Sequence, residues 1–312
     1  MGAQTYREVQ VVLGDREGQF SRDVSAALFT LGVRDLAICH DADELRGSVT
    51  PVVDLVLCDV DLPGIDFGVV SQDIRHERLG GNPFMVLIAM ARPSSEADLK
   101  RIIKSGVDAF LSRPMEAGDV MRQIGGFTKG RKPFVVTQGY VGPSRRDTRR
   151  EDGSDDDLME VPNTLRAKII EGLRFAEIQR QLEEGRTDVK RKKAGASLRT
   201  MARLTQRLVL QQAERAKADA VVRTLRQVAE KSDEIVNEHD GVSVTGHIAA
   251  IAARVGRLAR RAADDPGRSH GVEISLLAQL SDAAVGAYAS ATGSVDIARE
   301  IAAVVDGFLA RG

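Results

Sequence analysis

Three charged side chains of the sequence stand within two residues of the end of a short apolar run: Asp15, Asp59 and Arg113. A carboxylate in such a place can coordinate a cation or attack an electrophilic phosphorus, and a guanidinium can pair with a phosphate. In the stretch "DLVLCDVDLPG", Asp59 is followed closely by Pro63 and Gly64, which predict a sharp turn. These residues form one candidate site if the fold brings the ends of the runs together.

The first 127 residues alternate apolar runs of strand length with segments of helical spacing. Five strands separated by helices predict a parallel sheet covered on both faces, because parallel strands need crossover connections. Ligands bind such sheets beyond the carboxyl ends of the strands, where Asp15, Asp59, Met90 and Arg113 are expected. The runs are 9–13, 36–39, 55–58, 84–89 and 109–111, and the helical segments are 20–31, 42–46, 67–76, 95–103 and 117–124.

Asp15, the stretch "LVLCDVDLPG" and the stretch "DAFLSRP" together resemble the receiver domain of two-component response regulators, over about residues 5–127. The resemblance implies a flavodoxin-like, doubly wound, five-stranded parallel sheet. It also implies that Asp59 is a phosphoacceptor served by a sensor histidine kinase or a phosphotransfer protein. The family uses Mg²⁺, and here the implied ligands are Asp15, Asp59 and the backbone carbonyl of Asp61.

Three positions depart from the family's pattern. Arg16 stands where the family has a second acid after the first strand, and Met90 replaces the hydroxyl that normally receives a phosphoryl oxygen. Arg113 replaces the lysine that ends the fifth strand, and it keeps the charge but differs in plane and reach. Phe110 stands at the aromatic position whose rotation normally reports the state of the domain.

Two interpretations of this site stay open. In the first, Asp59 is phosphorylated, with an atypical metal site and switch, and Arg113 or Arg16 is the charge partner of the phosphoryl group. In the second, Arg16 or Arg113 pairs permanently with Asp59, and the domain is a docking scaffold that works without phosphorylation.

Residues 128–162 contain glycines, prolines, an arginine cluster and three successive aspartates, Asp155, Asp156 and Asp157. This composition cannot supply a core of its own and predicts a charged linker. Its first part, with Phe134 and Tyr140, could form an extended piece that docks on a neighbouring surface.

Residues 163–312 have apolar residues at helical spacing throughout, beginning with Asn163 as a helix cap. The pattern predicts a long helix over about 197–237 and further helices over 248–262, 274–288 and 297–308. Amphipathic helices cannot bury their apolar faces alone, so an all-α output domain is expected to form a bundle and to self-associate as a homodimer, with a coiled coil along the long helix.

The bulk composition narrows the class of protein. The formal net charge of -1 excludes a global field that attracts polyanions, so nucleic-acid binding through the local cluster of Lys190, Arg191, Lys192 and Lys193 is the lower-ranked alternative. No apolar run approaches the roughly 20 residues of a membrane span. Two cysteines within apolar runs are typical of a reducing compartment, so a cytoplasmic location is expected.

No catalytic signature occurs in the helical half. The sequence therefore predicts a response regulator without enzymatic activity, which signals through protein contacts. It does not indicate the downstream partner.

Overall fold

The computed structural model describes residues 6–16, 18–92, 96–145, 158–214, 216–239, 246–265 and 271–289. The chain divides into two compact units, Met1–Val189 and Lys190–Gly312. The division falls later than the predicted boundary between residues 162 and 163. The reason is that the first part of a long helix packs with the N-terminal unit.

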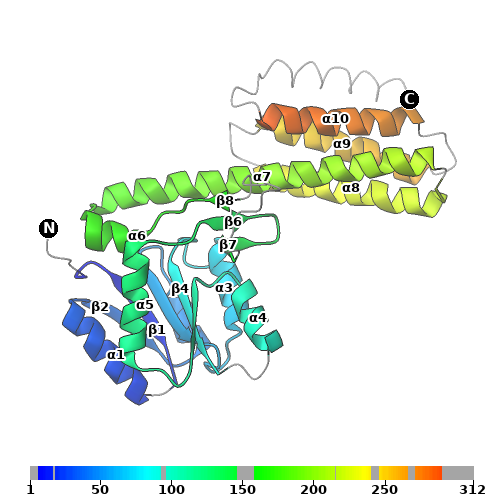
Figure 1. The fold of residues 1–312 in the computed structure, drawn as a ribbon. Coiled ribbons are helices and arrows are strands. Elements are labelled where there is room, and N and C mark those ends of the chain that lie inside the picture. Colours follow the sequence, from blue (N-terminus) through cyan, green and yellow to red (C-terminus); the bar gives the residue numbers. More distant parts are fainter. Residues whose placement is uncertain are drawn as a thin grey trace. The chain divides into compact units, whose positions relative to one another are not determined.

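The N-terminal unit is built around a parallel five-stranded sheet (Figure 1). Its strands have the order β2-β1-β3-β4-β5, which is that of flavodoxin-like doubly wound folds, so the predicted fold class is confirmed. The connections reverse direction between β1 and β3, which is where this fold places its ligands. The strands are β1 (Gln10–Gly14), β2 (Asp35–Cys39), β3 (Leu55–Asp59), β4 (Val86–Ala91) and β5 (Ala109–Ser112).

Helices cover both faces of the sheet. Helices α1 (Gly18–Leu31) and α5 (Ala117–Lys129) lie on one face, and α2 (Ala42–Ser48), α3 (Phe67–Arg75) and α4 (Glu96–Lys104) lie on the other. Buried strands alternate their side chains between these two layers. Leu57 packs in the α1 and α5 layer, whereas Val56 and Cys58 pack in the other.

The described part of residues 128–162 is folded, where the sequence predicted a charged linker whose first part could dock as an extended segment on a neighbouring surface. Strands β6 (Phe134–Val136), β7 (Val141–Pro143) and β8 (Leu158–Met159) form an antiparallel sheet of order β7-β6-β8. Phe134 is fully buried and packs with Phe84, which lies two residues before the start of β4. The small sheet folds because it shares this apolar cluster with the receiver-like domain instead of building its own core.

Asp108 joins the two sheets through two arginines. Arg75 Nη2 donates to Asp108 Oδ2 over 2.7 Å, and Arg131 Nε donates to Asp108 Oδ1 over 2.7 Å. The side chains of Asp108, Arg75 and Arg131 are 1%, 0% and 4% exposed. Both guanidinium groups also lie over the ring of Phe134, at 5.0 Å and 4.7 Å from its centroid.

The chain after β8 is fixed to the amino-terminal end of β3, at the same edge of the sheet as Asp108. Asn163 caps α6 (Thr164–Arg166) as predicted, because its Oδ1 accepts from the backbone N–H of Arg166 at 3.2 Å. A π-helical turn, η2 (Ala167–Glu171), follows. Within it, Lys168 Nζ donates to Asp54 Oδ2 over 2.7 Å, which holds this segment against the sheet.

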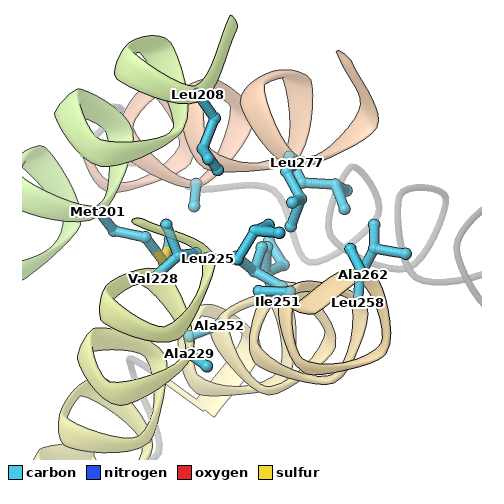
Figure 2. Packing of buried hydrophobic residues seen from close by; sticks show 14 of the residues in the cluster. Met201, Leu208, Leu225, Val228, Ala229, Ile251, Ala252, Leu258, Ala262 and Leu277 are labelled. Atoms are coloured by element: carbon cyan, nitrogen blue, oxygen red, sulfur yellow. The ribbon is translucent and has the colours of Figure 1, made fainter. Parts of the chain in front are cut away.

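The described part of the second unit is an antiparallel helical bundle. It contains the end of α7 (Phe175–Ala213), α8 (Ala218–His239), α9 (Gly246–Asp264) and α10 (Gly271–Ala289). Figure 2 shows apolar side chains of these helices converging on one core. Helices α7 and α10 approach closely at Gly195, where an added Cβ would lie 2.6 Å from the ring of Tyr288.

The predicted single long helix over about 197–237 is wrong. Helix α7 ends at Ala213 and α8 begins at Ala218, so the segment forms two helices of an antiparallel pair. The break lies where the apolar stripe of the sequence weakens, and folding back lets both halves bury their stripes in one core. The predicted helix over 297–308 lies outside the described residues. Within the described part of the chain, no helix has the length and apolar character needed to cross a bilayer.

We predict that Asp108→Asn strongly destabilises the protein, because it leaves two buried guanidinium groups without their carboxylate. The expected loss is about 3 kcal/mol or more in the free energy of unfolding, measured by urea denaturation. Asp73→Asn is the matched control, since Asp73 pairs with an arginine side chain that is 58% exposed, and it should cost less than about 1 kcal/mol. Equal effects of the two substitutions would contradict the assigned role of Asp108.

The same cluster predicts a pH dependence. Burial raises the pKa of Asp108, but the charges of Arg131 and Arg75 outweigh it, so the pKa lies below the ordinary value. A depressed pKa adds stability above the pKa of the unfolded chain, and this stability is lost as the pH falls through the folded-state pKa. The difference between wild type and Asp108→Asn should therefore shrink in acid, and a constant difference would argue against it.

Candidate functional site

The sheet places the predicted site residues at one edge. Asp59 is the last residue of β3, and the N–H of Asp15 donates to the carbonyl of Cys39 at 3.1 Å just beyond β1. The N–H of Arg113 donates to the carbonyl of Ala91 at 2.9 Å, which extends the pairing of β4 and β5. Asp15, Asp59 and Arg113 thus meet beyond the carboxyl ends of the strands, as the sequence predicted.

One guanidinium nitrogen bridges the two carboxylates. Arg113 Nη2 lies 2.5 Å from Asp15 Oδ1 and 2.9 Å from Asp59 Oδ2. The three side chains are nearly inaccessible, at 6% exposure for Arg113, 0% for Asp15 and 8% for Asp59. Charge-assisted hydrogen bonds at these distances in a desolvated site are strong, so Arg113 is the cation of this site.

Helix α1 completes the surroundings of Arg113. Ser21 Oγ donates to Asp15 Oδ2 at 2.6 Å, and the guanidinium carbon of Arg113 lies 4.8 Å from the centroid of the Phe20 ring. Sequence reasoning missed both residues. Their only signal is their place in the first turn of a helix that follows Asp15 closely, a position that many unrelated serines and phenylalanines share.

Asp59 has an unfavourable environment for its charge. Burial raises its pKa above the ordinary value, and the charges of Asp61 and Asp15 act in the same direction. The backbone N–H of Asp61, which donates to Asp59 Oδ1 at 2.9 Å, and the charge of Arg113 only partly offset this effect. The ionised form of Asp59 is therefore held by Arg113 and one amide, at a net cost relative to water.

The remaining predicted residues occupy the rim and the interior. Arg16 is exposed, and its Nη1 lies 3.5 Å from the carbonyl oxygen of Asp61. Met90 is fully buried beside Asp59, its partner in the pairing of β3 with β4. Phe110 is half-buried and packs on the α2 to α4 side of the sheet. Met90 places a thioether at the position where the family has a hydroxyl.

The implied Mg²⁺ does not fit this arrangement. A guanidinium nitrogen already contacts both carboxylates, within the space that an ion with ligand distances of about 2.0–2.1 Å would have to share with them. Arg16 lies over the carbonyl of Asp61, the third implied ligand. Two cations therefore stand where a divalent ion would need three oxygens. Among the described residues, no three His, Cys, Asp or Glu side chains are grouped to hold a metal.

The comparisons with known proteins concern the N-terminal part of the chain. No protein-family model and no curated protein matches the chain. The response regulator DrrB of Thermotoga maritima, an OmpR/PhoB homologue, is similar at 16% identity over 41% of this chain, with a TM-score of 0.36; the match spans 56% of DrrB.

Two isolated receiver domains are similar over most of their own length. A CheY-like receiver from Methanospirillum hungatei JF-1 has 18% identity over 38% of this chain and 93% of its own, with a TM-score of 0.35. The receiver domain of the sensor histidine kinase PA1611 of Pseudomonas aeruginosa PAO1 has 20% identity over 39% of this chain and 94% of its own, with a TM-score of 0.32. In that structure a magnesium ion is coordinated in the active-site cleft.

These identities describe a fold and not an activity. The matched structures are response-regulator receiver domains, and they cover about the first two fifths of the chain. The strand order independently gives the flavodoxin-like topology. The flavodoxin-like fold of the N-terminal part is thus assigned from its own strand order, and its activity has to be argued from its residues.

We predict that Asp59→Asn raises the free energy of unfolding at neutral pH. An acid with a raised folded-state pKa costs stability above the pKa of the unfolded chain, because the native state must give up a proton that it holds more tightly. The gain should shrink as the pH is lowered through the folded-state pKa toward about 4. Urea denaturation over this pH range measures the difference, with Asp35→Asn as the control, because Asp35 is exposed at the start of β2 and does not act on Asp59. A neutral-pH loss for Asp59→Asn would refute the prediction.

Proposed function

We propose that the N-terminal domain is a receiver-like signalling module of the two-component type that works through protein contacts, without a metal-dependent phosphorylation cycle. The observation that carries the proposal is the bridge from Arg113 to Asp15 and Asp59. We also propose that this domain has no enzymatic activity of its own. The proposal corresponds to the second of the two interpretations that the sequence left open.

The electrostatics of the site support this choice. Two buried carboxylates share one guanidinium. This side chain of the protein itself supplies part of the positive charge that a bound divalent ion would bring. A second cation placed next to Arg113 would be repelled by it in a medium of low dielectric constant. The fully buried Met90 offers no hydroxyl to an incoming phosphoryl oxygen. Each of these features favours a single fixed conformation of the site over a switch between two conformations.

A scaffold role also agrees with the way the domain continues into the rest of the chain. Arg131 follows α5 directly and ends in the Asp108 cluster, and Phe84 contacts α7 at Gly185, where an added Cβ would lie 2.9 Å from the Phe84 ring. The domain and the start of α7 are thus packed as one unit. A partner that docks on the domain, such as a histidine kinase or a phosphotransfer protein, would meet a preformed surface.

Phosphorylation of Asp59 is the second candidate function, and one observation favours it. Arg113 already contacts Asp59 Oδ2, so its guanidinium stands where it could grip a phosphoryl group on that oxygen with two donors. In this case an Asp59 oxygen forms the new bond to phosphorus, and the bond from phosphorus to the donor's leaving group breaks. Arg113 would then have to release Asp15 or share its donors.

A phosphodonor experiment decides between the two candidates. We predict that wild-type protein incubated with acetyl phosphate and Mg²⁺ gives no phosphoryl adduct in intact mass spectrometry. The triple variant Arg16→Asp, Met90→Thr and Arg113→Lys restores the residue types of the family, and it should acquire an adduct. The gain is expected because removal of both guanidinium groups opens the carboxylates and the Asp61 carbonyl to a cation.

Asp59→Asn in both backgrounds is the control, because it removes the acceptor and should abolish any specific adduct. A labile adduct on wild type that Asp59→Asn removes would replace the proposal by the second candidate. Far-ultraviolet circular dichroism shows whether the triple variant is folded, since Met90 is buried. If a folded triple variant gives no adduct, the blocking role assigned to Arg113 and Arg16 is wrong.

We also propose that the chain self-associates through its helical part. Exposed apolar side chains on the bundle support this proposal, namely Val209, Leu210 and Val272, with Leu210 at 62% and Val272 at 68% exposure. Light scattering of the full chain over a range of concentrations should give a mass above that of one chain. Leu210→Gln should shift the equilibrium toward the monomer, and a wild-type monomer at high concentration would contradict the proposal.

A further inference from the structure

Helix α7 changes its charge along its length. Its first part, residues 175–189, carries four acidic side chains and two arginines, whereas residues 190–213 carry seven basic side chains and no acidic one. The change coincides with the division between the two compact units at Val189 and Lys190. The basic part belongs entirely to the helical bundle.

The bundle uses one face of this basic part. Leu198, Met201 and Leu208 are fully buried, and Figure 2 shows Met201 and Leu208 directed toward the core shared with the other helices. At 3.6 residues per turn, Lys192, Arg199, Arg203 and Arg207 lie on the opposite side of α7. Lys192 and Arg207 are fifteen residues apart, which corresponds to roughly 22 Å along the helix axis.

Arg203 and Arg207 are the exposed members of this face. No acidic side chain within the described ranges pairs with either of them. They stand four residues apart, a spacing at which like charges destabilise a helix by about 0.2–0.5 kcal/mol per pair. The face thus lacks the alternation of charge that supports an isolated helix.

The neighbouring helix α8 shows the ordinary arrangement. Arg223 follows Asp219 by four residues, and Arg226 precedes Glu230 by four, so each arginine there has an acid on its own face. Attraction to acids of α8 and α10 explains basic residues at the edges of α7. A contact of this kind between helices of the bundle is the one in which Arg260 of α9 binds Asp233 of α8. Such attraction does not account for the outward pair, Arg203 and Arg207.

We propose that the outward face of α7, defined by Lys192, Arg199, Arg203 and Arg207, binds the phosphodiester backbone of a nucleic acid. A straight row of cations on a rigid helix fits a polyanion with regularly spaced charges. The exposed C-terminal part of the face, at Arg203, Gln206 and Arg207, is polar. The exposed Leu210 lies one turn beyond Arg207, at the end of the face and not at its centre, where protein interfaces place their apolar anchors. Because the net charge of the chain is only -1, the contact is local. It is independent of base sequence, because the cations meet phosphates and not base edges.

Fluorescence anisotropy of the full chain with a short labelled DNA duplex tests the proposal. Binding should be tight at about 25 mM salt and should weaken steeply toward about 200 mM. Arg203→Gln with Arg207→Gln should weaken binding and reduce the slope of log K against log salt by about 2, because each lost phosphate contact removes about 0.9 from the slope.

The matched control is Arg223→Gln with Arg226→Gln, which removes the same charge from α8, and it should leave the slope unchanged. Absence of binding at low salt, or equal effects of the two double variants, would overturn the proposal. The same holds if polyglutamate binds the protein and the duplex does not, since that outcome assigns the face to an acidic protein. None of these results bears on the phosphodonor experiment, which concerns Asp59 alone.

Discussion

Asp108 accepts hydrogen bonds from two buried arginines at the start of β5, and the architecture of the first unit depends on this contact. Without it, Arg75 and Arg131 would be buried cations beside Phe134, at a cost of several kcal/mol each. With it, the guanidinium groups can also bind carbonyl oxygens of the loop before β4, Arg75 to Pro83 at 2.6 Å and to Met85 at 2.8 Å. One carboxylate thereby fixes α3, β4, β5 and the strand β6 in a common geometry.

Buried charged clusters of opposite composition lie at the two ends of β5. At its start, one carboxylate serves two guanidinium groups, and the excess positive charge is spread over backbone carbonyls and the face of Phe134. Beyond its end, one guanidinium serves the carboxylates of Asp15 and Asp59, and the excess negative charge is carried by Ser21 and the N–H of Asp61. A short strand of four residues connects these clusters, so the position of Arg113 is tied to that of the Asp108 cluster.

The second unit follows a simpler rule, in which apolar faces close on each other and the charged faces remain outside. Its core residues come from all four helices, and α7 contributes Leu198, Met201 and Leu208. The sorting of charge by helix is a separate property that packing does not require. Because packing does not require this distribution of charge, the basic face of α7 can be assigned a partner independently of the receiver-like domain.

The sequence by itself determined the elements of the receiver-like sheet and the charged residues of its site, but not Phe20 and Ser21, because alternating apolar runs and strand-end charges are local signals. It could not determine the connections of Asp108, since an acid next to a strand has the same local pattern whether it is solvated or bound by two arginines from distant segments. It also left open whether a metal or Arg113 neutralises Asp15 and Asp59. Only the tertiary structure shows that Arg113 contacts both carboxylates, because the reach of one guanidinium across two strand ends depends on how β1, β3 and β5 are placed in the sheet. The hairpin of α7 and α8 was decided in the same way, by the gain in burial when the apolar stripes of both helices enter one core.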